Sequence, residues 1–169
     1  MKLLLATFIL LIALMSRLAV VPNGKIGEKE AVVSLSASEC YQRVTDTQTY
    51  PRWMPSVIST ESERKPFYAS IGGEFVLVID YGFLGTISYD AHILSVEPNS
   101  RFTFILDDWL ETKFDFFISP MDKEKSRIKL TVISNKHNLF YNHIILPIAH
   151  LYYSNWLTQC LLRFQLTYS

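Results

Sequence analysis

The feature that most constrains this chain is a change of hydrophobic period near residue 135. Between residues 74 and 133 apolar side chains alternate with polar ones, as in Ile128, Leu130 and Val132. A period of two is typical of antiparallel strands with one buried and one solvent-exposed face. The final 30 residues instead repeat apolar side chains every three or four positions, which predicts one long helix.

Shorter elements precede the alternating block. Residues Glu30–Leu35 form a candidate first strand, and Ser36 and Glu39 have the spacing of a capping box. A short helix is therefore expected to run to about Thr45. The proline-flanked segment 50–55 is expected to form a compact turn or a single helical turn. The later predicted strands are Val57–Lys65, at a sheet edge, Glu74–Tyr81, Thr86–Val96, Arg101–Leu106, Glu111–Ser119 and Arg127–Ile133.

These elements predict an α+β fold in which a curved antiparallel sheet of about seven strands wraps around a long C-terminal helix. The apolar face of such a sheet must be covered, and the single long helix is the available cover. Because sheets twist strongly, one helix does not fill the concave side completely. The space between the helix and the sheet is therefore the expected place for an apolar cavity.

The first 21 residues differ from the rest of the chain. Leu3–Met15 is interrupted only by Thr7, as in the apolar region of a secretory signal. Arg17 spoils the small-x-small pattern of a clean cleavage site. Leu3–Val21 is close to the ~20 residues that span a bilayer, so an uncleaved anchor is the preferred interpretation.

The sequence therefore predicts a signal peptide or transmembrane anchor over residues 1–21, a polar linker over 22–29 and a globular domain over 30–169. Retention of the first segment predicts a membrane-anchored protein, whereas its cleavage predicts a secreted or periplasmic one. The Lys and Arg residues that follow the segment slightly favour a cytoplasmic domain.

Charge and cysteine content exclude several classes of protein. The 16 Lys and Arg residues balance 16 Asp and Glu residues, whereas nucleic-acid binders normally carry a basic surplus. Two separated cysteines, Cys40 and Cys160, exclude a disulfide-dense scaffold and a CxxC motif. The sequence contains no HExxH motif and no phosphate-binding glycine loop. We therefore predict no nucleic-acid partner, no metal and no cofactor.

Three segments carry a resemblance to a known superfamily. They are the strand and capped helix over 32–46, the Tyr-Pro-Arg-Trp-Met-Pro turn over 50–55, and the strand-turn-strand element over 93–102. In this order and spacing they resemble the START-like (SRPBCC) superfamily of polyketide cyclases/dehydrases, lipid-transfer proteins and coenzyme-Q-binding proteins. The resemblance covers residues 30–168, although domains of this superfamily are usually not preceded by an apolar segment.

The resemblance implies a helix-grip fold with a deep pocket for a hydrophobic ligand. It implies no shared catalytic residues, because the superfamily contains both enzymes and carriers. The side chains predicted to contact the ligand are Trp53, Phe75, Leu77, Tyr81, Phe102, Phe104, Phe114, Phe116, Tyr152 and Trp156. The alternative interpretation is a packed core made of the same residues, and for Trp53 packing is preferred to a role as a lid.

Candidates for catalysis are few. His92 and Asp90 share one face of a predicted strand, but that face is mainly polar and therefore expected to face solvent. Tyr81 and Tyr89 lie on the opposite face, where a phenol could donate to a ligand carbonyl. No residue is assigned a catalytic role.

The leading hypothesis is a membrane-associated domain that binds a lipid or other hydrophobic small molecule, with transport or presentation as further roles. The alternatives are a cyclase/dehydrase-like enzyme that uses pocket Tyr or His residues for proton transfer, and an interaction module with a collapsed pocket. The sequence favours a binding protein over an enzyme, and its predicted partners are the hydrophobic ligand and a membrane.

Overall fold

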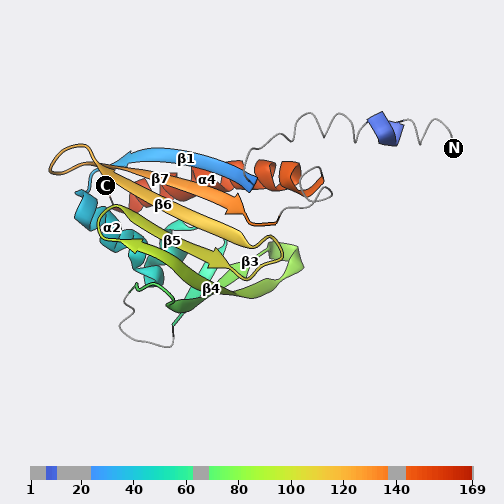
Figure 1. The fold of residues 1–169 in the computed structure, drawn as a ribbon, viewed down its shortest axis with the longest axis horizontal. Helices are drawn as coiled ribbons and strands as arrows, with labels where there is room; N and C mark the ends of the chain where they lie inside the picture. The colour runs from blue at the N-terminus through green and yellow to red at the C-terminus, as the bar shows by residue number, and fades with distance from the viewer. Residues whose placement is uncertain (1–6, 11–23, 63–68, 137–143, 169) are drawn as a thin grey trace.

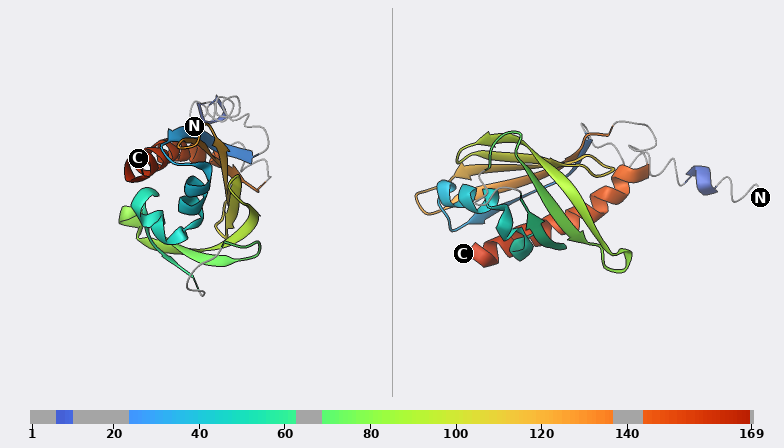
Figure 2. Two further views of the ribbon diagram at one scale, coloured as in Figure 1. Left: turned by 90° about the vertical axis from the view of Figure 1, so that its left-hand side faces the viewer. Right: turned by 90° about the horizontal axis from the view of Figure 1, so that it is seen from below.

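The computed structural model describes residues 7–10, 24–62, 69–136 and 144–168. These residues form one antiparallel sheet of seven strands in the order β1-β7-β6-β5-β4-β3-β2, which curves around the long helix α4 (Figures 1 and 2). The strands are β1 Lys25–Val33, β2 Val57–Glu61, β3 Glu74–Asp80, β4 Thr86–Glu97, β5 Arg101–Leu106, β6 Thr112–Pro120 and β7 Ser126–Ser134. The helices are α2 Ala37–Thr45, α3 Tyr50–Trp53 and α4 Leu146–Tyr168, with 3-10 turns η2 Thr47–Thr49 and η3 Gly82–Leu84.

This architecture confirms the predicted α+β helix-grip fold. Alternation places the aromatic side chains of the central strands on the concave face, where Phe102 lies opposite Phe116 and Phe104 opposite Phe114. All four rings are buried. Their burial against α2, α3 and α4 supplies the apolar area that stabilises the sheet.

The capping box of α2 is formed as predicted. The Ser36 Oγ accepts a hydrogen bond from the Glu39 N–H at 3.3 Å, and the Glu39 carboxylate accepts one from the Ser36 N–H at 3.0 Å. The helix ends at Thr45, also as predicted. It packs on β5, β6 and β7, while α3 packs on α4 and β2, so the two short helices cover one end of the concave face.

The first strand begins five residues earlier than the sequence pattern predicts. A linker was expected over 22–29, but residues 25–29 of that range belong to β1. Their charged side chains point to solvent and make cross-strand or local pairs: Glu28 lies 3.0 Å from the Lys25 amine and 3.7 Å from that of Lys129. Ile26 is buried on the other face. The charged residues on the exposed side of this edge strand therefore have the sequence pattern of a polar linker.

The predicted signal peptide or anchor over residues 1–21 lies outside the described residues except for positions 7–10, which are helical. Within the described part of the chain, no helix has both the length and the apolar character needed to cross a membrane.

The buried face of α4 differs from the predicted one by a small rotation. The repeat of apolar side chains every three or four residues predicts a buried face that contains Ile145, Ile148, Ala149, Tyr152, Trp156 and Cys160. In the structure the side chains of Ile148 and Tyr152 are instead exposed. The residues of α4 that are buried are Leu146, Ala149, Leu157, Cys160, Leu161 and Phe164. The cause is the position of the helix, which lies closest to β1 at the edge of the sheet rather than over its centre (Figure 2).

Candidate functional site

The concave face of the sheet has two parts, and the first is a packed aromatic core beside α2 and α3. The rings of Tyr50 and Trp53 lie 5.0 Å apart, and those of Trp53 and Phe164 are also 5.0 Å apart. The indole Nε1 of Trp53 donates to the Thr49 hydroxyl at 3.2 Å. The rings in this part that are fully buried belong to Tyr50, Trp53, Phe102, Phe104, Phe116 and Phe164.

The second part is a group of phenols between the first half of α4 and the β3–β4 hairpin. Tyr81 follows β3, Tyr89 lies on β4, and Tyr152 and Tyr153 are consecutive residues of α4. The ring centroids are 6.5 Å apart for Tyr81 and Tyr89 and 5.2 Å apart for Tyr152 and Tyr153. We call these four residues the tyrosine cluster. Tyr81, Tyr89 and Tyr153 are partly exposed and Tyr152 is exposed, so the cluster is accessible to solvent.

Three members of the tyrosine cluster, Tyr81, Tyr152 and Tyr153, are neutral hydrogen-bond donors. Burial raises the pKa of Tyr81, and a hydrogen bond with Tyr89 raises it further. Burial also raises the pKa of Tyr153 and, despite a hydrogen bond with Ser56, that of Tyr152. Since a free phenol has a pKa of about 10, these three side chains remain protonated at neutral pH. Each can therefore donate to an oxygen acceptor or accept from a donor.

A hydrogen-bonded chain connects the tyrosine cluster to a half-buried carboxylate. The Thr112 hydroxyl and backbone N–H donate to the two oxygens of Asp108, both at 2.7 Å. Tyr153 hydrogen-bonds the Thr112 side chain. This contact with Thr112 lowers the pKa of Tyr153 and partly opposes the effect of burial. Burial raises the pKa of Asp108, although its bonds from Thr112 partly oppose the shift.

Two aromatic side chains separate the tyrosine cluster from the packed core. The ring of Phe114 lies 6.3 Å from that of Tyr153, 5.7 Å from that of Trp156 and 5.0 Å from that of Phe104. The indole of Trp156 donates to the Pro55 carbonyl at 2.9 Å, which holds the ring beside the turn after α3. The wall of the candidate site therefore changes from polar phenols to buried hydrocarbon along α4.

The ten predicted ligand-contact residues are divided between the two parts. Three of them, Tyr81, Tyr152 and Trp156, are partly or largely exposed and lie in or beside the tyrosine cluster. The other seven are buried on the concave side: Trp53, Phe75, Leu77, Phe102, Phe104, Phe114 and Phe116. Tyr81 and Tyr89, both predicted as polar contacts, are brought together. The contact of these residues with a ligand stays a prediction.

Sequence reasoning missed the contribution of Tyr153, Thr112 and Asp108. Asp108 follows Asp107 in the turn between β5 and β6, and from the sequence alone this pair is typical of an ordinary polar turn. Thr112 and Tyr153 are far apart in the sequence and come from a strand and a helix, so no linear spacing connects them. The adjacent tyrosines at 152 and 153 were the only available signal.

The remaining candidates are structural in character. The His92 Nδ1 lies 3.1 Å from a Glu74 carboxylate oxygen on the outer face of the sheet, in agreement with the surface interpretation. Burial raises the pKa of the Cys40 thiol to about 11 and also raises that of Cys160, which makes both poor nucleophiles. Among the described residues, no group of three His, Cys, Asp or Glu side chains is placed to hold a metal ion.

Comparison with known proteins places this geometry in a fold class. No protein-family model matches the sequence, and no curated protein matches it. Solved structures do match. A START superfamily protein from Mycobacterium smegmatis has a TM-score of 0.64 at 14% identity, over 85% of this chain and 98% of that one.

A Polyketide_cyc-like protein, Cgl2372 from Corynebacterium glutamicum, has a TM-score of 0.59 at 14% identity, over 86% of this chain and 91% of that one. The di-domain ARO/CYC protein BexL from the BE-7585A biosynthetic pathway has a TM-score of 0.53 at 13% identity, over 64% of this chain and 35% of that one. The described domain has seven antiparallel strands curved around a long final helix, and it matches a START superfamily structure and a Polyketide_cyc-like structure over most of its length. It therefore has a START-like fold.

Proposed function

We propose that this domain binds a lipid or another hydrophobic small molecule between α4 and the concave face of the sheet. The observation that carries the proposal is the accessible tyrosine cluster at the edge of an otherwise buried aromatic face. Ligand sites typically combine mostly apolar walls with a few polar groups that fix orientation. The apolar wall here is formed by Phe114 and Trp156, and the polar groups are the four phenols.

The chemistry of the cluster defines the class of ligand. Neutral phenols of raised pKa donate hydrogen bonds but carry no charge, so they suit a ketone, ester or carboxyl oxygen. The buried aromatic side chains beyond them suit an aliphatic chain or a ring system. An amphipathic molecule with one oxygen-bearing end and one apolar end fits both requirements.

We further propose that residues 1–21 hold the domain at a membrane. The support is the 19-residue apolar run Leu3–Val21, interrupted only by Thr7, Ser16 and Arg17. A binding domain attached to a bilayer experiences a high effective concentration of lipid ligands. If the segment is instead a cleaved signal, the mature domain is released, and carbonate extraction of the expressed full chain distinguishes the two cases.

Ligand binding is tested by placing a charge in the tyrosine cluster. Tyr89→Glu is expected to weaken binding of a fluorescent fatty-acid probe by at least about tenfold, because a charge is costly to desolvate against an apolar ligand. Tyr41→Glu is the matched control, since Tyr41 is a partly exposed tyrosine of α2, at the other end of the fold. The measurement is probe titration, accompanied by mass spectrometry of lipids extracted from the purified full chain.

Two results contradict ligand binding at this site. One is absence of both extractable lipid and a probe response in the unaltered chain, which would favour the interaction-module alternative. The other is equal weakening by Tyr89→Glu and Tyr41→Glu, which would show that the charge acts on the fold in general.

A cyclase/dehydrase-like enzyme is the second candidate, and the Tyr153–Thr112–Asp108 chain is the observation that favours it. A phenol that is itself hydrogen-bonded to an orienting group can donate a proton to a substrate ketone oxygen. Tyr153→Phe is expected to slow cyclisation of a poly-β-ketone thioester by about 10²–10⁴-fold while changing affinity for the fatty probe by less than about threefold. Absence of any product from the unaltered protein with such thioesters excludes this candidate.

A further inference from the structure

A group of exposed apolar side chains lies at the same end of the molecule as the tyrosine cluster. Phe83 and Leu84 lie in the turn η3 between β3 and β4 and are 96% and 69% exposed. Ile148 and Leu151 lie in the first two turns of α4 and are 57% and 74% exposed. We call these four residues the apolar end patch.

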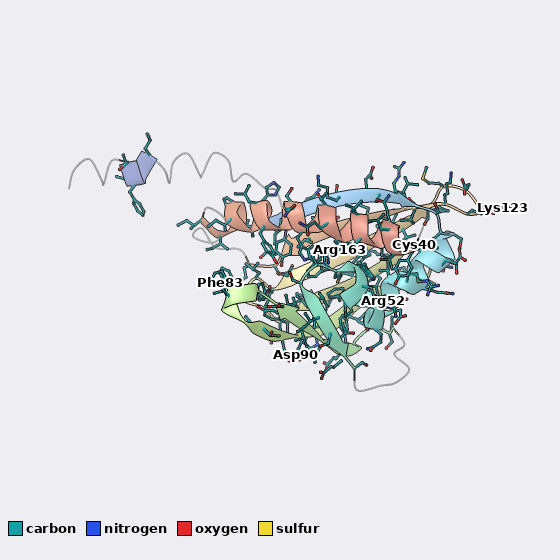
Figure 3. All side chains as sticks on the ribbon, turned by 180° about the vertical axis from the view of Figure 1, so that it is seen from behind. Cys40, Arg52, Phe83, Asp90, Lys123 and Arg163 are labelled. Carbon is teal, nitrogen blue, oxygen red and sulfur yellow. The ribbon has the colours of Figure 1, made fainter. Side chains whose placement is uncertain are left out.

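The two elements that carry the patch lie at one end of the fold. Tyr81, directly before η3, is close enough to Tyr152 and Tyr153 of α4 to interact with them electrostatically. Figure 3 shows Phe83 at the end where α4 begins, and Lys123 at the opposite end of the molecule. Figure 2 shows the same arrangement from below, with the β3–β4 hairpin and the start of α4 at one end.

The two segments that carry the apolar end patch contain no charged residue, although the β5–β6 turn at the same end of the sheet carries Asp107, Asp108 and Glu111. The segment from Tyr81 to Ile87 has no charged residue, and neither Lys, Arg, Asp nor Glu occurs from 144 to 162. The β6–β7 turn at the opposite end has four consecutive charged residues over 122–125. Several exposed apolar side chains at one end of a domain are typical of an interaction surface, whereas single exposed apolar residues are not.

The point at which the N-terminal segment joins the domain identifies what this surface contacts. Lys25 of β1 pairs with Ile133 at the end of β7, and the His150 Nδ1 contacts the Ile26 carbonyl, so β1 begins beside the first turns of α4. The sequence has only three residues between the apolar run Leu3–Val21 and Lys25. Three residues span about 10 Å at most, which keeps this end near any bilayer that holds the run.

We propose that the apolar end patch inserts into the surface of the bilayer that holds residues 1–21, so that the tyrosine cluster faces the membrane. This inference rests on the proposed function and specifies its geometry: an apolar ligand passes between bilayer and domain without crossing bulk water. Exposed aromatic and aliphatic side chains insert at the boundary between headgroups and acyl chains. Since the patch contains no Lys or Arg, docking requires no anionic lipid.

The test compares two exposed isoleucines at opposite ends of the fold. Ile148 belongs to the patch, whereas Ile71 is 71% exposed in the turn before β3 and therefore lies at the other end of that strand from η3. Ile148→Cys and Ile71→Cys are each labelled with an environment-sensitive fluorophore in the full chain. Cys40 and Cys160 are buried and react slowly. Each protein is reconstituted in phosphatidylcholine vesicles with and without nitroxide-labelled lipid.

The label at 148 is expected to be quenched at least about threefold more strongly than the label at 71, because only the patch reaches the depth of the interfacial region. Phe83→Ser combined with Leu84→Ser is expected to reduce the quenching at 148 by at least about half. Equal quenching at 148 and 71, or no quenching at either because the protein leaves the vesicles, overturns the proposal.

The probe titration with Tyr89→Glu reports separately on the ligand site. If the label at 148 is quenched but the probe does not bind, insertion of the apolar end patch is supported and ligand binding is contradicted. If the probe binds but the label at 148 is not preferentially quenched, only the insertion of the apolar end patch is contradicted.

Discussion

Trp53→Ala is expected to lower the free energy of unfolding by about 3–5 kcal/mol, the range for removal of a large aromatic side chain from a packed core. Trp53 is fully buried, although it belongs to a helix of only four residues. Its ring contacts Tyr50 of the same helix, Phe116 of β6 and Phe164 of α4. The substitution therefore removes the side chain that joins the short helices, the sheet and the long helix.

The measurement is urea unfolding followed by far-ultraviolet circular dichroism, which does not depend on tryptophan fluorescence. Trp109→Ala is the matched control, because Trp109 lies in the β5–β6 turn and is 61% exposed. We expect Trp109→Ala to lower the free energy of unfolding by less than about 1 kcal/mol. A Trp53→Ala protein as stable as the Trp109→Ala protein would contradict the assignment of Trp53 to the core.

Gly27→Val is expected to destabilise the protein by about 1–3 kcal/mol, because it adds volume where α4 packs against β1. A Cβ atom at Gly27 would lie 2.8 Å from Leu157 Cδ1. Leu157 is fully buried, so its side chain has little room to move away. Leu157→Ala alone is expected to cost about 2–5 kcal/mol through the cavity that it leaves.

The double variant provides the decisive measurement. In the double variant Gly27→Val with Leu157→Ala, the valine methyl groups would fill space vacated by Leu157. Its loss of unfolding free energy is therefore expected to be smaller than the sum of the losses in the two single variants by at least about 1 kcal/mol. Gly27→Val combined with Leu106→Ala is the control pair, since Leu106 is buried on β5 rather than on α4. Additive costs in both pairs would contradict a direct contact between Gly27 and Leu157.

The parts of the fold that depend on neighbouring residues could be predicted from the sequence. The Ser36–Glu39 capping box and the end of α2 at Thr45 follow from spacing over a few residues. The alternation of buried and exposed side chains along β5, β6 and β7 follows from the period of two in their sequences. A shift of one residue would exchange the buried and exposed faces of a strand. The number of strands and the order of elements come from these same local patterns.

The parts that depend on tertiary position could not be predicted. The sequence of β1 does not show that its charged side will pair with Lys129, a residue about a hundred positions later. A helical period also does not show whether α4 lies over the centre of the sheet or along β1. The position of α4 decides whether Tyr152 or Tyr153 points toward the sheet. The candidate site depends on that choice, since Tyr153 reaches Thr112 and Tyr152 does not take that contact.

The pairing of β1 with β7 has a consequence for biosynthesis. β1 is the first strand of the described domain to be synthesised, but its partner β7 and its cover α4 follow all the other strands. On the ribosome, Ile26 and Val33 of β1 therefore remain without their native neighbours until almost the whole domain has emerged. Such long-range pairing slows folding and leaves apolar surface uncovered in the nascent chain. Chaperones that shield nascent apolar segments should therefore assist this protein most during translation of the segment between β1 and α4.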